Sequence, residues 1–264
     1  MDPKKLWKLH RLAEGKTLFF QVGPLQLWVQ RSGSEWRVAE RRLSKQCKEC
    51  TLSTVASAPK GISFRSWAFT QNFEDIRLLP CLPDRPLVVK TLTTRIIPPK
   101  KETIFFLSLP LYGELSVGKD SQHWVLTEVP SSILSHTWIG DFFEGEGGYA
   151  LKTPASYALE DVNMLPNRVI CSLRVTNQGE KPLPIEKMCI RPEFLEIYAT
   201  TQSLWTNEMQ ATFRSTKQAI SIRYLPGAPT SPTKAVLLRP AAKKSKRNFL
   251  QRAFGSYVAY FSDA

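Results

Sequence analysis

The sequence predicts an all-β protein with one or two β-sandwich-like modules of mostly antiparallel strands, and short helices at its two ends. Apolar and polar residues alternate over many short runs, turn-forming residues separate these runs, and the chain contains 19 prolines. Alternation with a period of two is typical of a half-buried strand. Proline lacks an amide donor and clashes inside a helix, so the prolines argue against long central helices and fit strand ends and edges.

Length and composition indicate a globular protein. The 264 residues could bury one large core or two modest ones. A hydrophobic content of 42% and an aromatic content of 11% exclude wholesale disorder. No apolar run approaches the ~20 residues that span a bilayer, and no apolar stretch of the kind found in a secretory signal follows the basic N-terminus. We therefore expect a cytoplasmic protein, with the membrane periphery as a candidate location.

The N-terminal region divides at Gly15. Residues 1–15 are basic and place Leu6, Leu9 and Ala13 on one helical stripe, which predicts a short helix over 4–13. From Leu18 onward the apolar residues alternate with a period of two. The turn at residues 32–34, Ser-Gly-Ser, separates two such runs and predicts a β-hairpin.

The centre of the chain repeats this strand pattern, and we expect a β-sandwich core over 16–240. A boundary between two modules, if the core is divided, is expected within 80–122. The predicted strands are rich in β-branched and aromatic residues. They cover residues 86–99, 103–111, 123–129, 168–177, 185–190 and 194–199.

The C-terminal segment, residues 241–264, differs from the core. Residues 234–264 contain seven Lys or Arg against one Asp, a net charge of +6 out of +13 for the chain. Apolar residues recur there at helical spacing, which predicts a basic amphipathic helix. The predicted docking residues are Lys243, Lys244, Lys246, Arg247, Phe249, Leu250, Arg252 and Phe254.

Such a segment has three interpretations. It could pack against a protein partner, lie on an anionic membrane surface, or contact the phosphates of a nucleic acid. No recognition helix, zinc finger or RNA-binding aromatic motif supports the nucleic-acid interpretation. A protein partner, as an accessory subunit or a second copy of the chain, is the leading expectation.

Residues 135–153, SHTWIGDFFEGEGGYALKT, concentrate functional-looking side chains beside four glycines. In a structural interpretation Trp138 fills the core beside a glycine turn. In a functional interpretation Asp141, Glu144 and Glu146 bind a hard cation or act as acid and base, with His136 as partner. The structural interpretation is preferred, because cation loops space their ligands more regularly.

The five cysteines are odd in number and too sparse for a disulfide framework. Cys171 and Cys189 lie in apolar runs and are predicted to be buried thiols. Cys47 and Cys50 form a CxxC that supplies at most two zinc ligands, and no second ligand pair follows it. We expect two thiols on a polar loop, with metal binding or redox chemistry as alternatives. No nucleophile elbow, phosphate-binding loop or HExxH motif is present.

Several segments resemble an uncharacterised prokaryotic family known as domain of unknown function 432. The similarity covers roughly residues 75–240, and its most specific parts are TWIGD with GYALKT, and LWTNE. The resemblance supports the β-domain interpretation and transfers no catalytic residue. Members are associated with small-conductance mechanosensitive channels as genomic neighbours, which favours a membrane-associated role.

These observations predict a non-catalytic binding or assembly module, an accessory subunit of a larger complex with the membrane as one candidate site. No cofactor is predicted. The first alternative is a metal-binding protein or enzyme centred on His136, Asp141 and Glu144. The second is a nucleic-acid-binding protein that uses the basic C-terminal segment.

Overall fold

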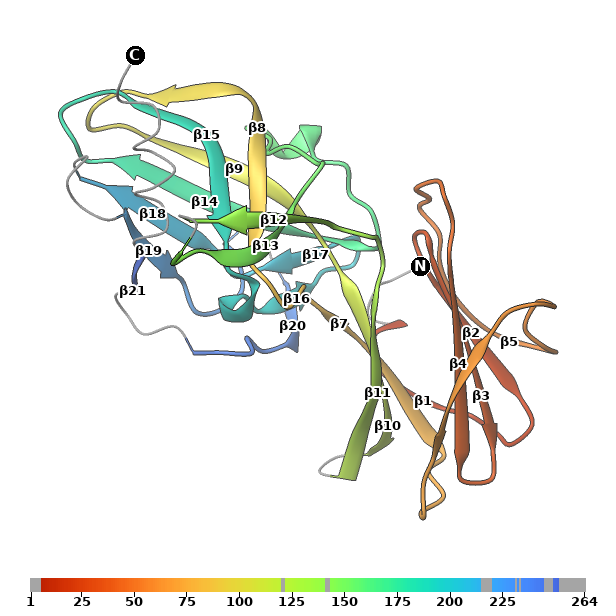
Figure 1. Ribbon diagram of the computed structural model, residues 1–264. Helices are drawn as coiled ribbons and strands as arrows, with labels where there is room; N and C mark the ends of the chain where they lie inside the picture. The colour runs from red at the N-terminus through yellow and green to blue at the C-terminus, as the bar shows by residue number, and fades with distance from the viewer. Residues whose placement is uncertain are drawn as a thin grey trace.

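The computed structural model describes residues 6–119, 122–140, 143–214, 220–230, 232, 234–244 and 249–251. Nearly all regular structure is in strands, so the all-β prediction is confirmed (Figure 1). Two short 3-10 helices occur, η1 (Leu159–Asp161) and η2 (Pro192–Phe194). Within these described ranges, no helix has the length and apolar character needed to cross a membrane.

Two sheets form the part of the molecule that we call the N-terminal sandwich. The first has the order β5-β2-β3-β4-β6, and the second has the order β1-β7-β10-β11; both are antiparallel throughout. The sheets pack face to face, with the His10 and Phe20 rings 5.7 Å apart. The strands are β1 (Leu9–Arg11), β2 (Thr17–Val22), β3 (Leu25–Ser32), β4 (Glu35–Arg42), β5 (Cys50–Val55), β6 (Phe64–Ala68), β7 (Asp75–Cys81), β10 (Tyr112–Lys119) and β11 (Gln122–Pro130).

The other two sheets form the C-terminal sandwich. One has the order β12-β13-β8-β15, and the other runs β20-β16-β17-β14-β18-β19-β21, with β9 on the second edge of β14. Three pairings are parallel, namely β13 with β8 and β14 with both β17 and β18. The strands are β8 (Leu87–Ile97), β9 (Glu102–Pro110), β12 (Ser135–Ile139), β13 (Glu146–Ala150), β14 (Arg168–Asn177), β15 (Leu183–Ile190), β16 (Ile197–Ala199), β17 (Leu204–Thr206), β18 (Met209–Phe213), β19 (Ile220–Tyr224), β20 (Val236–Arg239) and β21 (Phe249–Gln251).

The strand predictions hold where the alternation is strong, and the predictions for the chain ends are wrong where the structure describes them. Strand β14 has the predicted bounds, and the Gly33-Ser34 turn joins β3 to β4. Among the described residues of the helix expected over 4–13, only Leu6 is helical, because Leu9–Arg11 instead pair with the open edge of β7 as strand β1. At the other end, Phe249–Gln251 pair with β19 as β21, and residues 252–264 lie outside the described ranges.

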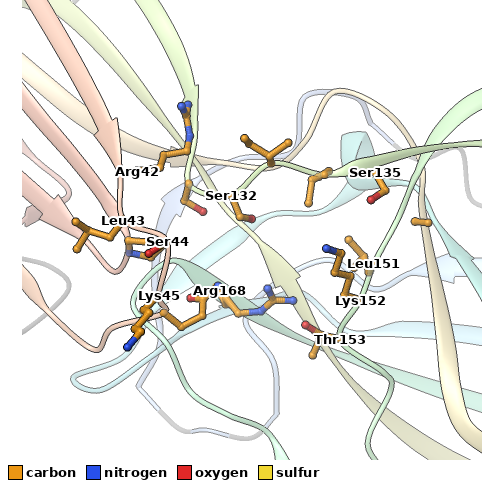
Figure 2. Close-up of a pocket in the computed structure, with 16 residues that line it drawn as sticks. Arg42, Leu43, Ser44, Lys45, Ser132, Ser135, Leu151, Lys152, Thr153 and Arg168 are labelled. Carbon is orange, nitrogen blue, oxygen red and sulfur yellow. The ribbon is translucent and has the colours of Figure 1, made fainter. Parts of the chain in front are cut away.

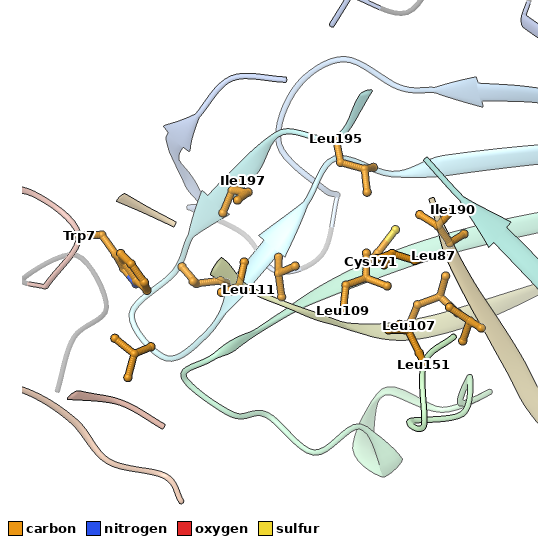
Figure 3. Close-up of a cluster of buried hydrophobic side chains, with 14 of the residues drawn as sticks. Trp7, Leu87, Leu107, Leu109, Leu111, Leu151, Cys171, Ile190, Leu195 and Ile197 are labelled. Carbon is orange, nitrogen blue, oxygen red and sulfur yellow. The ribbon is translucent and has the colours of Figure 1, made fainter. Parts of the chain in front are cut away.

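The hydrophobic core is continuous through both sandwiches. Leu107 of β9, Cys171 of β14 and Ile190 of β15 are fully buried between the two C-terminal sheets, and Trp7 lies at the far end of the same cluster (Figure 3). The predicted burial of Cys171 and Cys189 is confirmed. Burial raises the pKa of each of these two thiols to about 12.

The chain passes between the sandwiches three times. Residues 82–86 connect β7 to β8, the single residue Leu111 connects β9 to β10, and residues 131–134 connect β11 to β12. The second and third connections are bonded to each other, since the Ser131 N–H donates to the Leu111 carbonyl at 3.1 Å. The two sandwiches therefore share three covalent connections rather than one linker.

Gly23 brings the N-terminal sandwich into close contact with the start of β14. It lies in the β2–β3 turn with φ +57°, in the left-handed region that favours glycine. A Cβ atom at this position would lie 2.6 Å from Oδ1 of the buried Asn167. The Asn167 carbonyl in turn accepts a hydrogen bond from the N–H of Leu111 at 3.0 Å. Only glycine fits this turn without displacing Asn167.

The two hairpin-turn glycines provide a matched test of this contact. Gly23→Ala should lower the free energy of unfolding by more than Gly33→Ala, which has the same φ of +57° but no neighbour within 4 Å of its Cβ position. We expect about 1–2 kcal/mol for Gly33→Ala from the left-handed backbone alone, and about 1–3 kcal/mol more for Gly23→Ala from the crowding. Urea denaturation of both variants measures the difference. Equal losses of unfolding free energy would show that crowding against Asn167 does not contribute to stability.

A buried ion pair also links the sandwiches. Glu114 of β10 is buried, and its Oε2 accepts from Nη2 of Arg239 on β20 at 2.5 Å. Glu128 lies directly across β10–β11 from Glu114, and like charges in opposite positions destabilise a sheet. Arg239 therefore offsets a repulsion within the N-terminal sandwich from its position in the C-terminal one.

Glu114→Ala should lower the free energy of unfolding by about 1.5–3 kcal/mol, because it leaves the Arg239 guanidinium half-buried without its carboxylate. The exposed Glu128→Ala is the control and should stay within about 0.5 kcal/mol of the parent. Urea denaturation of Glu114→Ala, Arg239→Ala and the double variant completes the measurement. Additive single losses would mean that the pair is not coupled.

Candidate functional site

Residues 135–153, the segment with the most functional-looking side chains, form an antiparallel hairpin. Strand β12 pairs with β13 in the register His136 with Tyr149 and Trp138 with Gly147. The His136 and Tyr149 rings lie 5.3 Å apart. Gly148 packs tightly on the buried Ile139, where a Cβ atom would come within 2.4 Å of the Ile139 Cδ1.

The prediction that Trp138 fills the core is wrong. Its side chain is 52% exposed, whereas the next residue, Ile139, is 2% exposed. Neighbouring residues on a strand point to opposite faces, so burial of Ile139 turns Trp138 outward. The core position beside the glycine turn is therefore filled by an aliphatic residue.

The acidic residues of this segment do not gather in one place among the described residues. The Glu146 carboxylate forms a two-pronged ion pair with the Arg191 guanidinium, with Nη1 and Oε2 at 3.2 Å. Glu144 is exposed, and Asp141 lies outside the described ranges. Across those ranges, no group of three or more His, Cys, Asp or Glu side chains is placed to bind a metal. The metal-site alternative at Asp141, Glu144 and Glu146 stays a prediction.

Cys47 and Cys50 are half-buried free thiols beside the Gly23 turn. The Cys47 thiol donates to the Gly23 carbonyl at 2.8 Å, and Cys50 lies opposite Val22 at the start of β5. Burial raises the pKa of Cys50, so its thiol is protonated at neutral pH. The sequence-based alternatives of metal or redox chemistry at this pair remain predictions.

The structure describes only part of the predicted C-terminal docking residues. Lys243 and Lys244 are exposed after β20, and the backbone of Phe249 and Leu250 belongs to β21. Lys246, Arg247, Arg252 and Phe254 lie outside the described residues. The protein, membrane and nucleic-acid roles of this segment stay predictions.

A cleft at the junction of the sandwiches is the strongest candidate site (Figure 2). We call it the junction cleft, and its volume is about 350 Å³. Five chain segments line it, from the end of β4, the β2–β3 turn, the third crossing, the end of β13 and the start of β14. Its lining residues are Pro24, Arg42, Leu43, Ser44, Lys45, Gln46, Ser131, Ser132, Ile133, Leu134, Ser135, Ala150, Leu151, Lys152, Thr153 and Arg168.

All the charged side chains that line the junction cleft are positive. Arg42 and Lys45 come from the N-terminal sandwich, Lys152 and Arg168 from the C-terminal one, and no Asp or Glu is among the described lining residues. Within the described part of the chain, Arg42 is the one cation of these four with a carboxylate partner: it lies 3.2 Å from Glu40, which also pairs with Arg65. In the view of Figure 2, Lys45 and Lys152 lie on opposite sides of Arg168. Low-dielectric walls concentrate the field of such an arrangement, which attracts anions.

Arg168 is the most unusual of these cations. Its Nε donates to the Ser108 hydroxyl at 2.6 Å, and its Nη2 donates to the Ser108 carbonyl. Burial without a carboxylate among the described residues lowers the pKa of Arg168 to about 10. Two of its five N–H groups are used in this way, which fixes the guanidinium and leaves donors for a ligand.

The remaining lining provides hydroxyl groups and aliphatic surface. Ser44, Ser132, Ser135 and Thr153 contribute hydroxyls, and the Ser132 hydroxyl is buried without a partner in the described structure. The described lining contains no His, Cys or carboxylate that could act as a general base for these hydroxyls. The arrangement can bind an anion by charge and by hydrogen bonds.

The comparisons with known proteins give one result. The family described as "Protein of unknown function (DUF432)" matches residues 6–259. The chain belongs to this family. The resemblance expected from residues 75–240 is thereby confirmed, over nearly the whole chain. No curated protein and no solved structure matches it.

The sequence did not predict the junction cleft, although residues 135–153, the segment singled out from the sequence, contribute to its lining. Ser135 and residues 150–153 line the cleft, but the acids between them do not. The other lining residues, Pro24, 42–46, 131–134 and Arg168, lie far apart along the chain and carry no motif. Opposed basic residues become a site only when the three crossings bring both sandwiches together.

Thiol accessibility checks the cysteine placements. We expect Ellman's reagent to modify Cys47 fastest in the native protein, while Cys171 and Cys189 react only on unfolding, because burial keeps both protonated and shielded. Cys47→Ser should remove the fast phase and Cys171→Ser should not. A fast phase that survives Cys47→Ser would place the accessible thiol elsewhere.

Proposed function

We propose that this protein is a non-catalytic binding module that holds an anionic ligand in the junction cleft, between its two sandwiches. The observation that supports this most is that four cationic side chains and no described Asp or Glu line the cleft, and that Arg42 alone of the four has a carboxylate partner among the described residues. An unpaired, buried charge costs stability, so an arrangement that keeps Arg168 uncompensated suits a ligand that compensates it.

The position of the site supports a binding role within an assembly. The cations come in pairs from opposite sandwiches, so one anion would contact both halves of the molecule at once. The wider role as an accessory subunit, with a protein partner, remains part of this proposal and rests on the sequence.

The first test is anion-dependent stabilisation. Inorganic phosphate, titrated at constant ionic strength against chloride, should raise the melting temperature of the parent protein, because a ligand that binds only the folded state stabilises it. The gain approaches ~2.7 kcal/mol at a concentration 100 times Kd.

Arg168→Gln should weaken phosphate binding about tenfold or more, as expected for loss of a charged hydrogen-bond donor worth about 1.5–3 kcal/mol. Lys60→Gln, which removes an exposed lysine outside the cleft, should leave binding unchanged. Calorimetric titration of both variants gives the affinities. Equal phosphate affinities for the parent and Arg168→Gln would refute the proposed site.

A further inference from the structure

The size of the junction cleft speaks against a simple inorganic anion as its natural ligand. A water molecule in the liquid takes up about 30 Å³, so a volume of about 350 Å³ corresponds to roughly ten waters. A phosphate ion replaces only a few of them. A ligand that fills the cleft therefore carries a body in addition to its charged group, and the volume lies at the lower end of small-molecule sites.

The apolar lining of the cleft indicates what the uncharged part of the ligand is. The apolar lining residues are all aliphatic, namely Pro24, Leu43, Ile133, Leu134, Ala150 and Leu151. No Phe, Tyr, Trp or His is among the described lining residues, so a nucleobase would find no ring there to stack on. Flat aromatic bodies are thus disfavoured relative to saturated ones.

The hydroxyl groups add a second requirement. Ser44, Ser135 and Thr153 line the cleft, and their hydroxyls face solvent or the cleft without a hydrogen bond to another described residue. A wholly hydrocarbon body would leave these groups without partners when it displaced water, and a buried polar group without a partner is costly. A body with its own hydroxyl groups would satisfy them.

We infer that the ligand of the junction cleft is a phosphate ester of a saturated polyol, such as a sugar phosphate or a glycerophosphate group. This rests on the proposed function and deepens it. Arg168, Lys45 and Lys152 would hold the phosphate, while the hydroxyl groups and aliphatic wall would hold the polyol. The same chemistry occurs in a free sugar phosphate and in a phosphoglycerol lipid headgroup, so the test distinguishes these two sources.

The experiment is calorimetric titration of the full chain with inorganic phosphate, glucose 6-phosphate, glycerol 3-phosphate and phenyl phosphate at one ionic strength. At least one polyol ester should bind ten times more tightly than inorganic phosphate and more tightly than phenyl phosphate. Flotation with phosphatidylglycerol vesicles forms the lipid arm. If the parent protein binds the vesicles, Arg168→Gln does not, and the soluble esters bind weakly, then the phosphate ester is that of a lipid headgroup.

Matched variants test the contact with the polyol separately from the contact with phosphate. Thr153→Val should weaken binding of the preferred ester several-fold and leave inorganic phosphate unchanged. Thr54→Val, on exposed β5 outside the cleft, should affect neither ligand. Ile133→Ser removes part of the aliphatic wall at a position that is 85% exposed, so it tests the wall without threatening the fold.

The outcomes separate the two proposals. If inorganic phosphate and the esters bind equally through Arg168, the proposed function stands and the polyol inference fails. Tighter binding of phenyl phosphate than of any polyol ester or vesicle also overturns the inference. If no phosphate compound binds in solution or on vesicles, both the proposed function and the inference fail.

Discussion

The three crossings between the sandwiches are the constraint on which the rest of the structure depends. At the second crossing, β9 passes into β10 through the single residue Leu111, so one extended segment serves two different sheets. Its N–H and carbonyl are bonded to Asn167 and Ser131, which fixes the neighbouring segments around it. Three connections, two of them hydrogen-bonded to each other, restrict the two sandwiches far more than a single hinge would. The Gly23–Asn167 contact and the Glu114–Arg239 ion pair join the same two sandwiches at further points.

The junction cleft follows from this arrangement. It lies where the end of β4, the third crossing and the start of β14 meet, so its basic side chains come together through the packing of segments that are far apart in the sequence. Elsewhere at the junction the protein pairs its charges, the buried Glu114 with Arg239 and the more exposed Glu146 with Arg191. Arg168 differs from these paired residues, because it is buried without a carboxylate partner among the described residues. Arg42 and Arg168 lie on strands, and donors fixed on rigid elements lower the ordering cost of binding.

Much of the fold could be predicted from the sequence. Alternation over 168–177 and the Gly33-Ser34 turn reproduce β14 and the β3–β4 hairpin because both signals are local. The prediction of an N-terminal helix fails at Leu9–Arg11, because these residues pair with β7, a strand more than sixty residues later in the chain. Tertiary pairing here overrides a weak helical pattern. Trp138 was misplaced by one residue, which on a strand exchanges the buried and exposed faces.

The candidate site could not be predicted in the same way. Its lining comes from five segments between residues 24 and 168, none of which carries a motif. The sequence drew attention to the acids and glycines of residues 135–153, whereas the structure uses the two ends of that segment. A rule based on spacing along the chain cannot detect side chains that meet only through long-range pairing.

The interleaved connectivity has a consequence for synthesis on the ribosome. Strands β1 to β7 emerge first, but β10 and β11, which complete the second sheet of their sandwich, follow only after β8 and β9. Until residue 130 has left the exit tunnel, the apolar face around Phe20 and Leu25 has an incomplete cover. The nascent chain therefore carries an exposed, half-finished layer for a substantial part of its translation, when edge pairing with other chains is most hazardous. The order of the strands along the chain thus lengthens the time for which this sheet is incomplete, compared with a chain whose two sandwiches follow one another.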